Sequence, residues 1–254
     1  MGPETGAAPG PLGEAWRTIV PARGNPHGPL PPLLLLLTVV TGLVDAYSYL
    51  QLGHVFVANM TGNVVFLAFA LGGTAGFIWW ASILAIATFS AGAFIGGLIR
   101  TAHGAHRGKH LLVASTVQCV FFAAALLVAL TVSSPYADWV IAVQIGLLGV
   151  GMGVQNATAR ALAVPDLTTT VLTLTITGIS ADSTAAGGTS SRFGRRFVSI
   201  ASMFVGALAG TLLVHAGLIP LVLASAVVLV LTVIVISSAQ RRSAGGWATP
   251  PAKG

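Results

Sequence analysis

Asp45 is an acidic residue well inside the first long apolar run of the chain. A carboxylate in apolar surroundings is costly unless it is protonated, paired or in contact with water. Such an acid can couple proton movement to substrate movement or bind the substrate itself. It can equally hold helices together through donors such as Tyr47 or Tyr49. Its counterpart in the second half is the uncharged pair Gln155 and Asn156, so any proton coupling is expected to be asymmetric.

Two short polar stretches have the composition of helix starts that bind a ligand. In the stretch Asn59 to Asn63, Asn59 suits an N-cap because its side-chain oxygen can accept a first-turn N–H. In the stretch Pro165 to Thr170, Asp166 is the expected cap. Free N–H groups and the positive dipole end of a helix favour an anionic or polar group, although plain capping is the alternative. The candidate ligand-binding residues here are Asn59, Thr61, Gly62, Asn63, Asp166, Thr168, Thr169 and Thr170.

Arg160 follows Gln155 and Asn156 at the end of the fifth apolar run. It could neutralise Asp45 or Asp166, or hold a substrate carboxylate or phosphate through two hydrogen bonds. The alternative is an anchor whose charged end reaches the membrane surface.

The chain has no convincing catalytic or metal-binding set. Its single cysteine, Cys119, excludes an intrachain disulfide and cysteine-based metal clusters. His103, His106 and His110 have helical spacing, but their loop carries no helix signal. No phosphate loop, Ser-x-x-Lys or zincin motif occurs, so we expect no enzyme, no cofactor and no metal.

Composition places these residues in a membrane protein. Only 7% of the residues are charged, 55% are apolar, and the mean hydropathy is +0.88. A soluble domain usually carries about 25% charged residues, so this chain cannot cover a water-facing surface. Its net charge of +6 comes from basic residues between apolar runs. That distribution is typical of membrane orientation and not of a nucleic-acid-binding surface.

Six apolar runs reach the roughly 20 residues that span a hydrocarbon core of about 30 Å. Two others, 54–73 and 164–182, open with an extended-looking stretch and continue as a helix of about 18–21 Å. The sequence therefore predicts an all-α polytopic protein with about six transmembrane helices and two short re-entrant or broken helices. The eight runs lie at 33–52, 54–73, 77–99, 111–132, 139–159, 164–182, 197–216 and 219–237.

Charge favours re-entry of both short segments. With both termini cytoplasmic and both segments re-entrant, all 12 basic residues fall on the inner side, as the positive-inside rule prefers. Full crossing would instead move four of them outside: Arg100, Arg107, Lys109 and Arg160. The expected location is the bacterial inner membrane.

The two halves, 33–132 and 139–237, have matching organisation and opposite topology, which predicts an inverted repeat within one transmembrane domain, 33–237. Placing Met60 over Leu167 aligns the two short segments at a spacing of 107 residues. The tails, 1–32 and 238–254, are rich in polar residues, Pro and Gly, and are expected to be disordered and cytoplasmic.

The stretches TGLVDAYSYLQLGHVFVANMTGN (41–63) and GMGVQNATARALAVPDLTTTVLTLT (151–175) resemble the signature regions of the YoaK family of bacterial membrane proteins, a domain of unknown function. The resemblance covers roughly 33–237. It implies a multi-span inner-membrane protein and leaves the substrate open.

The function that these residues favour is a small secondary transporter for a small polar or anionic molecule. Its site would lie where the two helix starts meet, with Asp45 as the coupling acid and Gln155, Asn156 and Arg160 on the opposite wall. A channel that uses the hairpins as a filter, or a structural role without transport, are the alternatives. The expected partners are the bilayer and the substrate, with no nucleic acid, and homo-oligomerisation stays open.

Overall fold

The computed structural model describes residues 10–22, 24–170, 172–183, 186–188, 192–240 and 245–249, and every regular element in these ranges is helical. Six helices of 22 to 25 residues are apolar enough to cross a membrane, and at 1.5 Å per residue each is about 33–38 Å long. This confirms the all-α polytopic fold. The long helices are α2 (Leu30–Gln51), α4 (Trp79–His103), α5 (Arg107–Thr131), α6 (Asp138–Leu162), α8 (Phe193–His215) and α9 (Ile219–Gln240).

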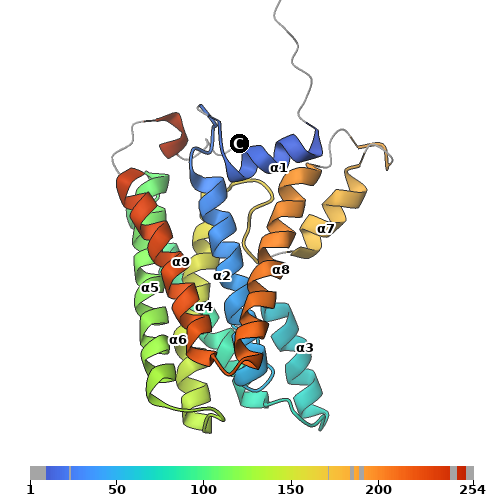
Figure 1. The fold of residues 1–254 in the computed structure, drawn as a ribbon, viewed down its shortest axis with the longest axis vertical. Coiled ribbons are helices and arrows are strands. Elements are labelled where there is room, and N and C mark those ends of the chain that lie inside the picture. The colour runs from blue at the N-terminus through green and yellow to red at the C-terminus, as the bar shows by residue number, and fades with distance from the viewer. Residues whose placement is uncertain are drawn as a thin grey trace, which may run out of the picture.

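The two shorter apolar helices each lie beside one end of the bundle (Figure 1). After α2, residues 52–59 turn back into the molecule, and α3 (Met60–Leu71) returns to the end at which α2 finished. After α6, residues 163–170 do the same at the opposite end, and α7 (Leu172–Ala181) returns. Each short segment therefore enters and leaves at the same end, and its helix covers only about 15–18 Å.

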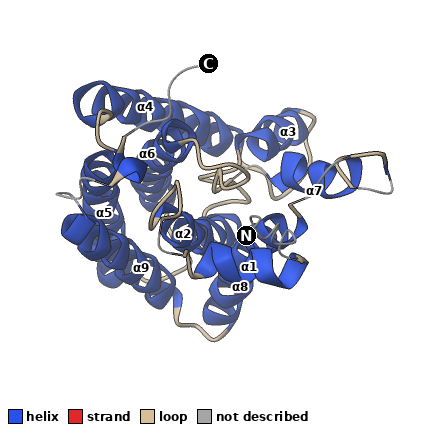
Figure 2. Cartoon of the chain, turned by 90° about the horizontal axis from the view of Figure 1, so that it is seen from above, coloured by secondary structure: helices blue, strands red, loops and turns tan. Residues whose placement is uncertain are grey.

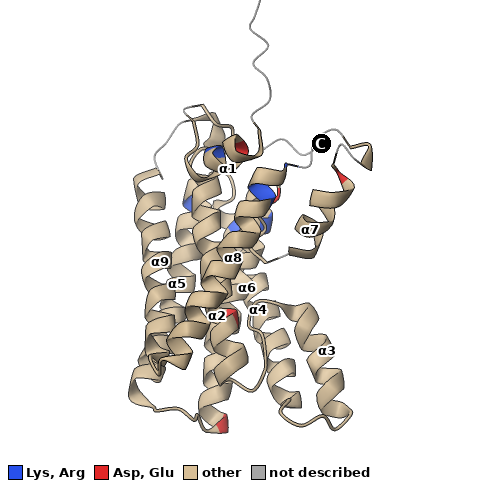
Figure 3. Ribbon diagram, turned by 45° about the vertical axis from the view of Figure 1, so that its right-hand side comes forward, with Lys and Arg blue, Asp and Glu red and all other residues tan. Residues whose placement is uncertain are grey.

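The helices surround a centre formed by α2 and α6, which have the largest buried share of the six long helices. Seen from above, α5 and α9 lie on one side of this centre, and α3 and α7 lie on the other (Figure 2). Lys and Arg residues gather in the half of the molecule that carries α1, which we call the basic end (Figure 3). The positive-inside rule predicts that this end faces the cytoplasm.

Helices α2 and α8 approach so closely that only glycine fits between them. A Cβ atom at Gly42 of α2 would overlap the carbonyl oxygen of Met203, and one at Gly206 of α8 would overlap that of Val39. Small residues at a helix interface permit this approach of two backbones, and the resulting van der Waals packing helps to drive helix association within a bilayer.

Helices α4 and α6 form a second pair with the same contacts. A Cβ atom at Gly92 of α4 would overlap the carbonyl oxygen of Val150, and one at Gly153 of α6 would overlap that of Phe89. The glycines of α2 and α6 are 111 positions apart, and those of α8 and α4 are 114 apart. Each pair therefore joins one helix from each half of the chain.

The N-terminal segment differs from the disordered tail expected for 1–32. Helix α1 (Pro11–Ile19) packs across the basic end against α8, and the Glu14 Oε2 atom accepts a hydrogen bond from the Gly194 N–H (3.2 Å). α1 is amphipathic: Leu12 and Trp16 are exposed, and Thr18 is buried. The apolar residues of α1 are too few for a membrane span. The composition of 1–32 therefore gave no sign of an interfacial helix. Residues 1–9 lie outside the described ranges.

The C-terminal segment also contains structure within the expected tail 238–254. α9 continues to Gln240, and a 3₁₀ turn, η2 (Gly246–Ala248), follows. Trp247 of this turn covers Gly28, and its carbonyl oxygen accepts from the Arg107 guanidinium (3.3 Å). Residues 241–244 and 250–254 lie outside the described ranges.

Close packing of α2 on α8 predicts that Gly206→Ala destabilises the protein. The added methyl group must push the Val39 backbone away, and overpacking of this kind costs about 1–3 kcal/mol. Gly97→Ala is the matched control, because no atom lies within 4 Å of its Cβ position. Thermal unfolding of both variants in one detergent measures the difference. Equal melting temperatures would contradict the packing described.

The fold predicts that Ala105, after α4, and Ser133, after α5, lie at opposite ends of the bundle. In a Cys119→Ser background, a membrane-impermeant maleimide should label Ser133→Cys in intact cells. Ala105→Cys should react only after permeabilisation. The reverse pattern would contradict the re-entrant arrangement with cytoplasmic termini, and external labelling of both would contradict the crossing of α5.

Candidate functional site

A cavity of about 550 Å³ lies where the two re-entrant segments meet, and we call it the central cavity. Its wall contains residues from the start of α3, from α6 and from the start of α7, and it also includes Phe89 of α4 and Met203 of α8. The structure thus brings together five of the predicted site residues: Asn59, Thr61, Gly62, Asn156 and Thr170.

A smaller cavity of about 270 Å³ lies against α2, and we call it the side cavity. Asp45 and Tyr49 of α2 line it, together with Asn59 and Met203, which also line the central cavity. The carboxyl group of Asp45 is therefore separated from the central cavity by residues that border both spaces.

Asp45 is buried, and only one of its two carboxyl oxygens has a hydrogen-bond partner within the described ranges. Its Oδ1 atom accepts a hydrogen bond from the backbone N–H of Ala58 (2.9 Å), in the extended segment before α3. Its Oδ2 atom has no partner within the described ranges. The donor is a backbone group, not the hydroxyl of Tyr47 or Tyr49 that the sequence suggested. Asp45 thus ties the re-entrant segment to α2 and still offers one oxygen.

Asn59 and Asn63, which the sequence placed together in one ligand site, have different roles. Asn59 precedes α3 but makes no side-chain capping bond, which corrects the expected N-cap. It is exposed and borders both cavities. Asn63 is fully buried; its Oδ1 accepts from the Phe56 N–H (2.9 Å) and its Nδ2 donates to the Phe56 carbonyl (2.6 Å). Asn63 therefore holds the extended segment, and Asn59 is available to a ligand.

The second re-entrant segment begins its helix later than expected. α7 starts at Leu172, so the predicted match of Met60 with Leu167 is wrong by about five residues. Asp166 lies in the loop with a left-handed φ of 63° and is not a cap. It pairs with Arg196 (3.0 Å) and Arg192 (3.5 Å), and Arg196 also pairs with Asp182 (2.8 Å). These ion pairs fasten both ends of the segment to α8.

Gln155 belongs to a buried hydrogen-bond network and not to a cavity wall. Its Nε2 atom donates to Thr41 Oγ1 (2.9 Å) and to the Leu37 carbonyl (3.2 Å), and its Oε1 atom accepts from Gln118 (2.6 Å). The network joins α2, α5 and α6. Asn156, on the next position, donates to Thr170 Oγ1 (2.7 Å) at the central cavity.

Three remaining predicted residues lie away from the two cavities. Arg160 is exposed at the end of α6 and pairs with neither Asp45 nor Asp166, so its position is that of a membrane-surface anchor. Thr168 is exposed in the loop. Thr169 is buried with a φ of 65°, and its hydroxyl has no partner in the described part of the chain.

Aromatic side chains around the cavities were missed, because nothing in their spacing separates them from ordinary apolar residues. Tyr49 stacks on Phe56 with ring centroids 5.2 Å apart, and Phe56 contacts Phe66 at 5.4 Å. Tyr49 and Phe56 line the side cavity, and Phe66 lines the central cavity. The rings therefore form an apolar boundary between the two spaces. Among the described residues, no group of three or more His, Cys, Asp or Glu could hold a metal.

Comparison with known proteins identifies the family. Residues 33–235 match the family model described as protein of unknown function (DUF1275), and the chain belongs to this family. It is 34% identical over 152 residues to the UPF0700 transmembrane protein YoaK of Bacillus subtilis (strain 168). The alignment covers 59% of this chain and 65% of that relative, just under two thirds. No solved structure matches. The resemblance to the YoaK family is thereby confirmed.

The two asparagines provide a matched pair for a stability prediction. Asn63→Ala leaves the partly buried N–H and carbonyl of Phe56 without their side-chain partner, which costs up to about 1–3 kcal/mol for each unsatisfied group. Asn59→Ala removes no intramolecular hydrogen bond and should leave the melting temperature close to that of the wild type. Thermal unfolding measures both. Similar melting temperatures for the two variants would refute the assignment of their roles.

Proposed function

We propose that this member of the DUF1275 family is a secondary transporter that binds a small polar molecule in the central cavity. The observation that carries the proposal is the position of Asp45. Its carboxyl group is buried in the membrane-spanning helix α2 and lies six residues, or about 9 Å, before the end of that helix. It has one unpartnered oxygen and borders a cavity that shares residues with the central cavity. An ionisable group at this depth is expected to have a functional role.

Contacts of the kind that an inverted repeat would have support this proposal. Residues at matching positions of the two halves make matching contacts: α2 packs on α8 as α6 packs on α4, and α3 lies on α4 as α7 lies on α8. In transporters with inverted repeats, substrate binds near the bilayer midplane where discontinuous segments of the two halves meet. The central cavity lies between the starts of α3 and α7, where this arrangement would place a substrate.

The close helix pairs supply two rigid units for alternating access. Phe89 and Asn156 bring the α4–α6 pair to the wall of the central cavity, and Met203 brings the α2–α8 pair. Rocking of one pair against the other would open this space towards one end of the bundle and close it from the other. The glycine contacts resist separation within a pair, so the movement would occur between the pairs.

The lining favours an uncharged or positively charged polar substrate over the anion first expected. Asn59, Thr61 and Asn156 offer amide and hydroxyl groups, while Phe66 and Phe89 offer aromatic faces. Asp45 is the one charged residue among those that line the two cavities. A carboxylate repels an anion, and aromatic faces attract a cation.

The repeat also sets an upper limit on proton coupling. The position 111 residues beyond Asp45, by the spacing of the paired glycines, is Asn156, whose amide does not titrate. One ionisable group then serves both halves, so at most one proton would be exchanged at this site in each cycle. Loss of that proton as a cationic substrate binds would keep a carboxylate from being buried without a partner.

The first experiment identifies a ligand and places it in the cavity. A library of small neutral and cationic compounds is screened by thermal shift against the wild type, Asn59→Ala and the exposed-acid control Asp138→Asn. A ligand of the central cavity should stabilise the wild type and Asp138→Asn and bind Asn59→Ala at least about 10-fold more weakly, or about 1.4 kcal/mol. Equal stabilisation of all three would place the ligand elsewhere.

The second experiment tests coupling with the ligand found. In proteoliposomes that contain a pH-sensitive dye, the wild type should move protons when the ligand is added, and Asp45→Asn should bind the ligand without moving protons. Ligand flux that is independent of a pH gradient and survives Asp45→Asn would favour a channel. Binding without any flux in either protein would favour a structural or sensing role.

A further inference from the structure

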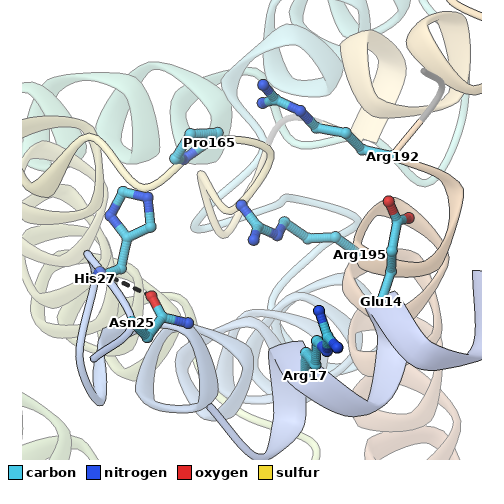
Figure 4. A pocket seen from close by; sticks show the side chains of 7 residues that line it. All are labelled: Glu14, Arg17, Asn25, His27, Pro165, Arg192 and Arg195. Atoms are coloured by element: carbon cyan, nitrogen blue, oxygen red, sulfur yellow. Dashed lines mark hydrogen bonds between the residues drawn. The ribbon is translucent and has the colours of Figure 1, made fainter. Parts of the chain in front are cut away.

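We propose that a third cavity, at the basic end, binds the phosphate group of a small molecule or lipid. This basic cavity has a volume of about 420 Å³ and lies between α1, the segment before α2, the loop after α6 and the start of α8. It is separate from the proposed transport site and does not depend on it. Its charged and polar lining residues are Glu14, Arg17, Asn25, His27, Arg192 and Arg195 (Figure 4).

Three guanidinium groups converge on this cavity from two helix regions. Arg17 extends from α1, whereas Arg192 and Arg195 extend from the start of α8, and Arg195 lies between the other two in the view of Figure 4. Arg17 and Arg195 make no hydrogen bond or ion pair within the described ranges. Asp166 and Glu14 attract Arg195 electrostatically without an ion pair to it. Like charges that line one cavity repel each other, and an anion bound between them would remove that repulsion.

The nearby carboxylates are already occupied. Glu14 accepts the backbone N–H of Gly194 at the start of α8 (3.2 Å), and Asp166 pairs with Arg196 and Arg192. The wall of the cavity therefore carries three arginines and a single carboxylate that is already hydrogen bonded. Arg195 is partly buried, whereas Arg17 and Arg192 are exposed, and this local excess of positive charge favours a partner of opposite charge.

His27 adds a hydrogen-bond donor without adding charge. Its backbone N–H donates a hydrogen bond to Asn25 Oδ1 (2.8 Å), and its ring Nδ1 lies 3.5 Å from the Arg107 guanidinium. A guanidinium can only donate, so Nδ1 accepts and the proton of the neutral ring is on Nε2. Loss of water contact, followed by the positive charges of Arg107, Arg195 and Arg192, lowers the pKa of His27. The ring is therefore neutral at pH 7.

These groups suit a phosphate group better than a carboxylate. A phosphate has several oxygens directed to different sides, and each planar guanidinium can bind two of them. Arginines on two separate elements can therefore hold one phosphate from more than one direction. The volume of the basic cavity also exceeds that of inorganic phosphate, so an organic substituent has room.

A lipid headgroup and a free phosphate compound share this chemistry. α1 crosses the basic end with Leu12 and Trp16 exposed, which is the placement of an interfacial helix. An apolar groove of about 340 Å³ begins beside it at Ile19 and continues along α2 at Leu33 and Leu36. This groove could hold an acyl chain of a phospholipid whose headgroup occupies the basic cavity.

A ligand in the basic cavity would restrain the second re-entrant segment. Pro165, at the start of that segment, lines the basic cavity, and Thr170, five residues on, lines the central cavity. A phosphate held by Arg17 and Arg195 would join α1 to the start of α8, where Asp166 is also fastened. The bound ligand would therefore hold this segment against α8.

The test uses full-length protein purified in a neutral maltoside detergent. Inorganic phosphate and glycerol 3-phosphate are titrated at two ionic strengths against the wild type, the double variant Arg17→Gln/Arg195→Gln, and the control Arg100→Gln. Arg100 is an exposed arginine outside the basic cavity. In a second series, nanodiscs of phosphatidylcholine alone are compared with nanodiscs that contain phosphatidylglycerol.

At least one of these ligands should stabilise the wild type and Arg100→Gln, and more strongly at low salt. The double variant should bind the same ligand at least 10-fold more weakly. An effect of free phosphate compounds would assign a soluble ligand, and an effect of phosphatidylglycerol alone would assign a lipid. If the double variant folds poorly, Arg17→Lys/Arg195→Lys keeps the charges and should still bind more weakly, because lysine cannot bind two oxygens at once. Equal responses of wild type and arginine variants to every ligand would overturn the proposal.

Discussion

The need to satisfy every backbone polar group in a medium without water governs this structure. Helices satisfy their own N–H and carbonyl groups, but the extended segments 52–59 and 163–170 do not. In the first segment, the side chains of Asp45 and Asn63 supply the missing partners at Ala58 and Phe56. The second is anchored through its side chains: Asp166 to the arginines of α8, and Thr170 to Asn156. Several polar residues that resemble ligand-binding groups are therefore required by the fold itself.

The same requirement distinguishes the Asp45 Oδ2 atom and the Asn59 amide from the polar groups that the fold uses. Once the bonds of the extended segments are counted, Asp45 Oδ2 and the side chain of Asn59 still lack intramolecular partners in the described structure, and both border cavities. The basic cavity at the end of the bundle shows the same contrast. Arg196 forms ion pairs with Asp166 and Asp182, whereas Arg17 and Arg195 form none within the described ranges. Unused hydrogen-bonding capacity at the wall of a cavity, more than polarity alone, is what the proposed ligand-binding groups share.

The sequence predicted what depends on hydropathy and net charge, and it failed where the outcome depends on single contacts. Length and apolarity predict the six spans. The two runs that begin with polar residues, 54–73 and 164–182, predict the re-entrant segments. The late start of α7 was missed because Asp166 and Thr169 adopt left-handed backbone angles, which interrupt an apparently helical run. The role of Asn63 was missed because its partner lies seven residues earlier, in a segment whose path no local pattern reveals. Helix α1 was hidden in a Pro- and Gly-rich stretch because it needs α8 to pack against.

The exchange of helices between the two halves has a consequence for biogenesis. Because α2 packs on α8 and α4 packs on α6, a nascent chain that ends after α5 has neither of its close partners available. The first four membrane segments must therefore wait in the bilayer, with the glycine-lined surfaces of α2 and α4 uncovered, until the second half has been inserted. Such a protein depends on the insertion machinery or on lipid to shield an unfinished intermediate.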